Sequence, residues 1–196
     1  MGGIEGSGGV AVVGQELSAI LKEVGENMVK AFGDLLDRAP GKKSAAANGD
    51  AAEEFSIPVT QNMATALRQL LRIQRDILSP QQIQLLVKHA GASFDLAVAQ
   101  SYHVKEATLE LLCTLLHEHC PAQLDAVWEI VCKQVVTTLS KVESKSLLTP
   151  ALRVASELAR VAVRSQADHS ISAFTLFQSA QTQMDSADTE QVSALF

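Results

Sequence analysis

Apolar residues recur along most of this chain at intervals of three and four, the period of helices buried on one side. The first such series lies in residues 14–38 and predicts a single amphipathic helix. Its stripe consists of Leu17, Leu21, Val24, Met28, Ala31 and Leu35. Gly25 and Gly33 lower the helix propensity by roughly 1 kcal/mol each relative to alanine. The helix therefore needs a partner surface, either the body of this protein or another chain.

The same period continues through residues 57–184 with short breaks, and predicts a run of helices joined by brief connections. The expected helices cover 59–78, 80–91, 94–100, 104–119, 121–140, 149–164 and 170–182. The helix over 104–119 carries leucines on two sides, which are Leu109, Leu112 and Leu116 on one and Leu111 and Leu115 on the other. A helix that is apolar on two sides is expected to be covered on both.

Proline and capping residues mark the helix starts. Ser79 is a good N-cap, Pro80 suits the first helical position, and Gln82 completes a capping box. Thr149-Pro150 repeats the cap-plus-proline signal, and Asp168 or Ser170 is expected to cap the last long helix. Ser79-Pro80 and Thr149-Pro150 also fit proline-directed phosphorylation sites, although their capping roles already explain them.

The periodicity divides the chain into five parts. Residues 1–13 are glycine-rich and expected to be flexible, and 14–38 form the amphipathic docking helix. Small and polar residues without periodicity make 39–56 a flexible linker. The helical domain follows at 57–184, and 185–196 form an acidic and then apolar tail.

An internal repeat links the helices in pairs. Moving residues 66–82 onto 107–123 superposes five identities, which are Ala66/Ala107, Leu70/Leu111, Leu71/Leu112, Pro80/Pro121 and Gln82/Gln123. The pair 104–140 recurs as 149–182 in its apolar pattern alone. Two helices every ~40–47 residues is the spacing of HEAT and armadillo repeats, which this region resembles. The resemblance implies an all-α, short superhelix of about three helix pairs with an N-terminal tethered amphipathic helix, and a role in binding other proteins.

Composition narrows the functional classes. No glycine follows Gly91, which argues against phosphate loops and dinucleotide fingerprints in that half. The net charge is −6 and no segment is strongly basic, so nucleic acid is not the expected partner. No apolar stretch approaches the ~18 residues of a membrane span. Three cysteines leave at least one thiol without an intramolecular partner, which favours a reducing compartment. We expect a cytoplasmic protein, including one associated with the cytoskeleton or another large complex.

One group of residues has metal-ligand spacing. Cys113, His117 and Cys120 lie at i, i+4 and i+7, with Cys132 on the next helix. Cys113 and Cys120 also fall on the leucine stripe, where free cysteine is commonly a buried apolar residue. There is neither a CxxC pair nor a nucleophile–base motif. The sequence therefore favours no metal, no cofactor, no small-molecule substrate and no enzyme, with a metal-binding or catalytic helical protein as an alternative.

Two rows of arginines are candidate binding residues, together with Leu17, Leu21, Val24 and Met28. They are Arg68, Arg72 and Arg75 at i, i+4 and i+7, and Arg153, Arg160 and Arg164 at i, i+7 and i+11. Such rows suit an acidic helix or peptide, and the alternative is a solvated face with local ion pairs to Asp76 and Glu157.

The aromatic residues Trp128, Phe174 and Phe177 are expected in the core, which leaves aliphatic helix faces and arginines for binding. We expect a non-enzymatic protein–protein interaction module, a scaffold or structural subunit of a larger multi-subunit assembly. A superhelical membrane-trafficking adaptor is the alternative.

Overall fold

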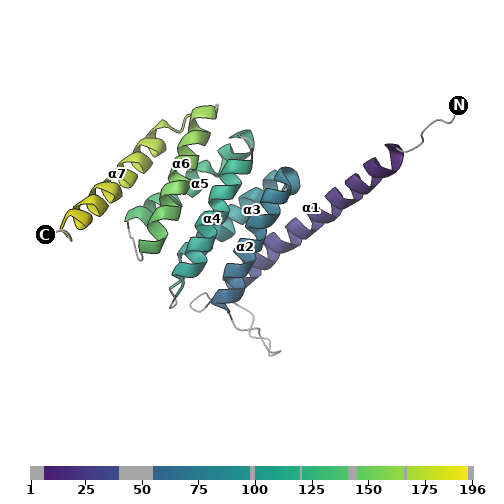
Figure 1. The fold of residues 1–196 in the computed structure, drawn as a ribbon, viewed down its shortest axis with the longest axis horizontal. Coiled ribbons are helices and arrows are strands. Elements are labelled where there is room, and N and C mark those ends of the chain that lie inside the picture. Colours follow the sequence, from purple (N-terminus) through teal and green to yellow (C-terminus); the bar gives the residue numbers. More distant parts are fainter. Residues whose placement is uncertain are drawn as a thin grey trace.

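The computed structural model describes residues 7–39, 55–97, 100–119, 121–140, 145–165 and 167–193. Within these ranges the chain forms seven α-helices, two 3₁₀ turns and no strand, which confirms the all-α class (Figure 1). The helices are α1 (Ser7–Asp37), α2 (Ile57–Ile73), α3 (Pro80–Phe94), α4 (Tyr102–Glu118), α5 (Pro121–Ser140), α6 (Leu148–Arg164) and α7 (Ser170–Ser193). The 3₁₀ turns are η1 (Arg75–Ile77) and η2 (Lys145–Leu147).

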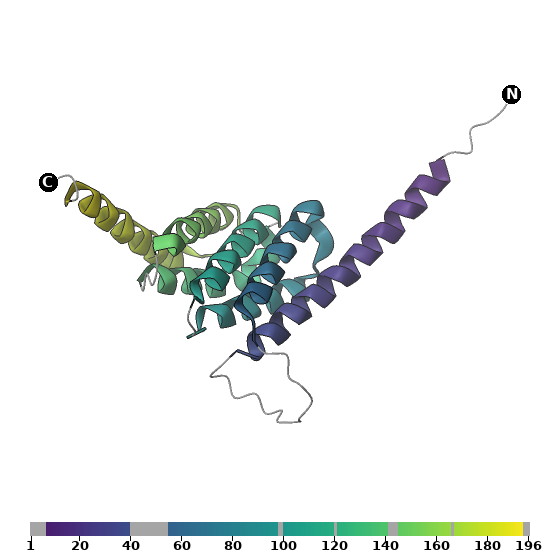
Figure 2. The same cartoon turned by 60° about the horizontal axis from the view of Figure 1, so that its bottom comes forward.

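The helices form two layers. In one layer α4 lies between α2 and α6, and in the other α3 contacts α1 and α5, and α5 contacts α7. The layers are joined by contacts between α1 and α2, α3 and α4, α5 and α6, and α6 and α7. The stack begins with α1 and ends with α7, so these two helices lie at opposite ends of the molecule (Figures 1 and 2).

Helix α4 is covered on both sides, as its two leucine stripes predicted. Its neighbours are α2 and α6 within its own layer and α3 in the other. The fully buried leucines of this helix are Leu109, Leu111, Leu112, Leu115 and Leu116. Because burying one leucine contributes about 1.5–3 kcal/mol, α4 is the main apolar support of the stack.

The capping box at Ser79 is confirmed. Ser79 Oγ accepts a hydrogen bond from the Gln82 backbone N–H at 3.3 Å, and Gln82 Oε1 accepts one from the Ser79 N–H at 2.7 Å. The break expected near Gly91 is wrong, because α3 runs through it to Phe94. A methyl group at Gly91 would overlap the side-chain amide of Gln134, so the glycine allows α5 to lie close to α3.

The helix expected over 94–100 is absent from the described part of that segment, where residues 95–97 follow the end of α3 and Gln100 has a φ of 62°. The helix expected over 59–78 is also interrupted, since α2 ends at Ile73 and Arg75 lies in η1. Gln74 has extended backbone dihedrals, which breaks the ladder of helical hydrogen bonds between the two.

Three helix ends differ from expectation. Helix α6 begins at Leu148, so Thr149 lies in its first turn rather than at the cap. First-turn N–H groups have no acceptor within the helix, so Pro150 is tolerated there. Helix α7 continues into the expected tail as far as Ser193, and α1 begins at Ser7, within the segment expected to be flexible. Neither helix contains the proline that would interrupt it.

Most of the expected linker, residues 40–54, lies outside the described residues, as do residues 1–6 and 194–196.

Helix α1 packs on the body from Ser18 onward, where Ser18 Oγ accepts a hydrogen bond from Gln74 Nε2 at 2.9 Å and Leu21 packs against the core. Val29, Phe32 and Leu36 are buried, and α1 contacts α2, η1 and α3. A methyl group at Gly33 would overlap the His89 ring, and one at Gly25 would lie 3.2 Å from Leu78 Cδ2. Both glycines therefore allow a close approach of α1. The part of the helix before Ser18 extends away from the stack (Figure 2).

Gly33→Ala should lower the free energy of unfolding by about 1–2 kcal/mol, because crowding against His89 outweighs the gain of roughly 1 kcal/mol in helix propensity. Gly14→Ala is the matched control, since no atom lies within 4 Å of its added methyl group. Urea unfolding followed by circular dichroism measures both. Equal midpoints for the two variants would contradict close packing at Gly33.

Candidate interaction surfaces

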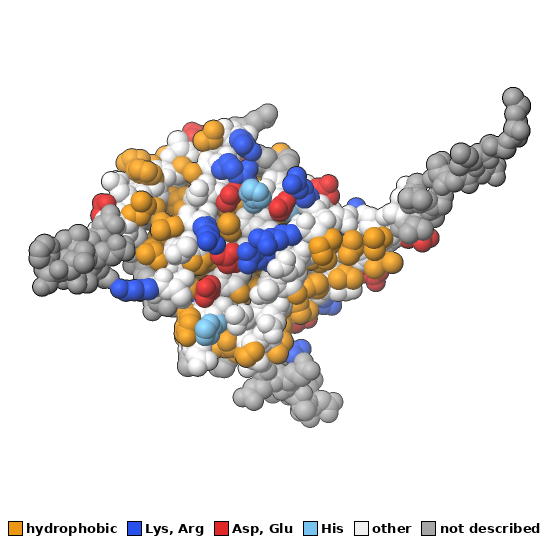
Figure 3. Space-filling model, viewed as in Figure 1, with side chains coloured by type: hydrophobic (Ala, Val, Ile, Leu, Met, Phe, Trp, Pro, Cys, Tyr) orange, Lys and Arg blue, Asp and Glu red, His pale blue; other side chains and the backbone are white. Residues whose placement is uncertain are grey.

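The two arginine rows lie on either side of α4 and are largely tied to it. Glu110 of α4 bridges both rows, with Arg68 Nη2 at 3.0 Å from Oε2 and Arg153 Nη1 at 3.1 Å from Oε1. Arg75 Nε lies 2.8 Å from Glu118 Oε2. These ion pairs join α2, η1, α4 and α6 across one face of the molecule, where Figure 3 shows basic and acidic side chains intermingled.

Arg160 forms hydrogen bonds with both a neighbouring side chain and a backbone carbonyl group. Its Nε donates to Glu157 Oε2 at 2.6 Å, and its Nη2 donates to the carbonyl oxygen of Leu116 at 2.7 Å. The second bond satisfies a carbonyl near the C-terminal end of α4, which has no helical N–H partner. This arginine therefore fixes α6 against the end of α4.

Arg72 and Arg164 differ from the other four arginines, because neither forms an ion pair with any described residue. Both are exposed. Arg72 borders a small polar hollow of about 170 Å³ that Glu110, Cys113 and His117 also line. Within the two rows, these are the cations that have no carboxylate partner among the described residues and are fully available to an acidic partner.

The cysteines show no metal site in the described part of the chain, where no three potential ligands come together. Cys113 is half-buried and Cys132 is buried, and neither is in a disulfide. His117 Nδ1 lies 3.3 Å from Glu157 Oε1. Cys120, the remaining residue of the expected group, lies outside the described residues.

Burial affects both described thiols. It raises the pKa of Cys132 to about 11, and the Glu129 carboxylate adds to the effect. The pKa of Cys113 is also raised, first by burial and then by the Glu157 and Glu110 carboxylates. Both thiols are therefore protonated near neutral pH and are poor nucleophiles.

The expected docking stripe of α1 divides into two groups. Leu21 and Met28 are half-buried and pack against the core. Leu17 and Val24 are 55% and 39% exposed, and Ile20 beside them is 56% exposed. These three residues form an exposed row, the α1 ridge, next to the side of the helix that contacts the body through Ser18 and Leu21.

The position expected for two aromatic residues is wrong. Trp128 is buried, but Phe174 and Phe177 of α7 are 62% and 64% exposed. The side of α7 that packs inward carries Leu176 with the small residues Ala173 and Ala180. On the side of α7 that faces α5, Cys132 Sγ donates to the Ser172 carbonyl oxygen at 3.5 Å. The phenylalanines are therefore turned outward.

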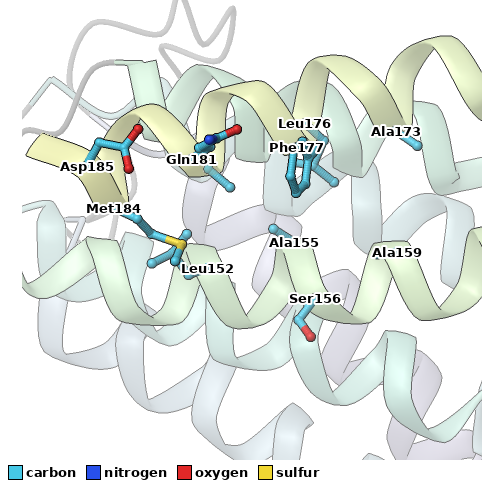
Figure 4. Close-up of a pocket in the computed structure, with 11 residues that line it drawn as sticks. Leu152, Ala155, Ser156, Ala159, Ala173, Leu176, Phe177, Gln181, Met184 and Asp185 are labelled. Carbon is cyan, nitrogen blue, oxygen red and sulfur yellow. The ribbon is translucent and has the colours of Figure 1, made fainter.

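An apolar groove of about 530 Å³ runs between α6 and α7, and we name it the α6/α7 groove. Figure 4 shows its side chains pointing into the space between the two helices. Leu152 and Met184 face each other near one end, Phe177 lies on the α7 side, and Ala155 and Ala159 lie on α6. Ile171 and Phe174 add exposed apolar surface to α7.

Sequence reasoning missed this groove although it identified the residues. The residues Ile171, Phe174, Phe177 and Ala180 form an apolar stripe at helical spacing, and such a stripe normally marks a buried face. The competing stripe of Ala173, Leu176 and Ala180 has the same helical spacing. The available signal was this second stripe, because a helix with two apolar stripes buries only the one that its neighbours cover.

The described residues include no helix with the length and hydropathy needed to span a membrane. In comparisons with protein-family models, curated proteins and solved structures, no match to this chain was found. The functional argument therefore depends on the surfaces themselves.

At pH 8, Cys132 should react with iodoacetamide about 100-fold more slowly in the folded protein than in urea, because a pKa of about 11 instead of 9.0 removes most of the thiolate. Cleavage after glutamate separates the peptides of Cys113, Cys120 and Cys132 for mass spectrometry. Raising the pH should increase the rate. Equal rates in the folded and unfolded protein would contradict the burial of this thiol.

Proposed function

We propose that this protein is a non-enzymatic protein–protein interaction module, a scaffold or structural subunit of a larger assembly, built as a short HEAT/armadillo-like superhelix. The two-layer arrangement supports this architecture. Helices α2, α4 and α6 begin at Ile57, Tyr102 and Leu148, so successive starts are 45 and 46 residues apart. That interval lies within the ~40–47 residues of HEAT and armadillo repeats.

The α1 ridge carries the functional proposal. Leu17, Ile20 and Val24 lie in one exposed row on α1, and no element of the described part of the chain covers them. Amphipathic helices gain most of their stability from packing of the apolar face, and an isolated helical segment is marginal in water. A protein partner that covers this ridge supplies the missing contact, in the manner of helix-in-groove recognition.

The exposed arginines and the free thiols indicate the charge of the partner and the redox state of the compartment. Arg72 and Arg164 supply exposed cations for acidic residues of a partner, whereas the remaining arginines of the two rows hold the helices together. The unpaired, protonated thiols of Cys113 and Cys132 fit a reducing compartment such as the cytoplasm.

Affinity capture from the native source followed by mass spectrometry tests the proposal. The triple variant Leu17→Ser, Ile20→Ser, Val24→Ser should reduce recovery of co-purified proteins by about ten-fold or more, because truncating central apolar contacts typically costs more than 1 kcal/mol each. All three positions are exposed, so folding should be unaffected.

The matched control carries serine at Lys22, Glu26 and Lys30, which are exposed polar positions on the same helix, and should retain the partners. A second arm with Arg72→Glu and Arg164→Glu identifies partners bound through acidic residues. Unchanged recovery in both variant sets would contradict the proposed role of these surfaces.

A further inference from the structure

The two ends of the molecule expose apolar surfaces of complementary shape, a ridge at one end and a groove at the other. At one end, the N-terminal half of α1 presents the α1 ridge to solvent. At the other end, the α6/α7 groove presents an apolar trough with no helix in it. Because α1 and α7 lie at opposite ends of the stack, the helix of one chain cannot enter the groove of that same chain (Figures 1 and 2).

The groove lies where the next helix of the α2–α4–α6 layer would pack. Helix α4 contacts α2 in its own layer and α3 in the other, and α6 contacts α4 and α5 in the same way. A helix in the α6/α7 groove would contact α6 and α7, which continues this arrangement by one step. The vacancy therefore has the geometry of a helix seat rather than of a small-molecule pocket.

The lining of the groove suits a helix. Alanines at positions 155, 159, 173 and 180 form much of it, and small residues at a contact allow the axes to approach to about 8 Å. Along α7 the groove extends from Ala173 to Asp185, about 18 Å at 1.5 Å per residue. The N-terminal half of α1, from Ser7 to Val24, spans about 26 Å by the same rise and is long enough to fill it.

The charges at the edges match in sign and in spacing. Glu16 and Glu23 directly precede the ridge residues Leu17 and Val24 and lie seven residues apart. Arg153 and Arg160 directly follow the groove residues Leu152 and Ala159 and also lie seven residues apart. Two helical turns separate each pair, so an acidic edge on α1 can run alongside α6, where Arg153 and Arg160 each keep guanidinium N–H groups that their contacts within the fold do not use.

We infer that the N-terminal half of α1 of one copy docks in the α6/α7 groove of a second copy of this chain. This inference rests on the proposed interaction function and identifies the partner as the protein itself. The contact is heterologous, because two different surfaces meet, and successive copies form an open chain or a closed ring. Apolar contact between the α1 ridge and the groove supplies the affinity, and the glutamate and arginine edges set the register.

A mixing experiment tests this arrangement. The ridge variant carries Leu17→Asp and Ile20→Asp, and the groove variant carries Phe177→Asp and Ala159→Trp. All four positions are exposed, and circular dichroism checks that both variants fold. Sedimentation velocity is run on the wild type, on each variant and on their equimolar mixture, up to about 100 μM to detect a micromolar interface.

The wild type should exceed its monomer mass of 20.9 kDa increasingly with concentration. Each variant alone should stay monomeric, while the mixture should form a dimer and stop there, because only one intact ridge and one intact groove remain to pair. A wild type that stays monomeric would overturn the inference. A mixture that stays monomeric would also overturn the inference. In that case the wild type would associate through one self-complementary surface and not through a ridge and a groove.

The pairing of the glutamate edge of α1 with the arginine edge of α6 has its own test with a matched control. Glu16→Lys with Glu23→Lys should weaken self-association several-fold at low salt, with a smaller effect at high salt. Glu26→Lys, on the opposite side of α1 from the ridge, should leave it unchanged. If both variants weaken self-association equally, the proposed pairing of the two charged edges is wrong.

Failure of this inference is distinguishable from failure of the proposed function. If the wild type is monomeric but captures other proteins through the α1 ridge, the interaction function stands and the self-assembly does not.

Discussion

The burial of α4 on both sides is the constraint from which the arrangement of the other helices follows. Five fully buried leucines contribute about 1.5–3 kcal/mol each, and they require α2 and α6 to lie on either side. The remaining face of α4 then brings Glu110 and Glu118 between two rows of arginines. Exposed ion pairs of this kind contribute about 0–1 kcal/mol each, so they follow from the packing and do not cause it.

The same constraint explains why the exposed apolar surface lies at the ends. The helices α3, α4 and α5 each have a neighbour on both sides within their own layer, whereas α1 and α7 each have one on a single side among the described helices. Helix α1 uses Val29, Phe32 and Leu36 for the body and leaves the α1 ridge uncovered. Helix α7 packs through its small residues and leaves Phe174 and Phe177 outside. The surfaces available for binding are therefore those that the stack cannot cover by itself.

Much of the fold could be predicted from the sequence, and what could not depended on contacts between distant residues. The capping box at Ser79 and the two-sided burial of α4 are local patterns, and both are confirmed. From the sequence alone, Gly25, Gly33 and Gly91 are expected to weaken or break their helices, but the structure places each against a side chain from another element. Local charge pairing suggested Asp76 as an arginine partner, whereas Arg75 pairs with Glu118 from the next helix of the layer. On α7, helical spacing allowed two inward faces, and the packing against α5 and α6 buries the one that carries Leu176.

The exposed phenylalanines change the expected mode of binding. From the sequence, arginines and aliphatic faces were the expected contacts, but four of the six arginines are engaged within the fold. Apolar contact at the two ends is therefore the stronger source of affinity. Net charge does not oppose association of copies at −6 each, because the Debye length is about 8 Å at physiological salt and distant charges are screened. In the proposed contact between copies, the acidic edge of α1 is attracted by the guanidinium N–H groups of Arg153 and Arg160 that Glu110 and Glu157 leave unused.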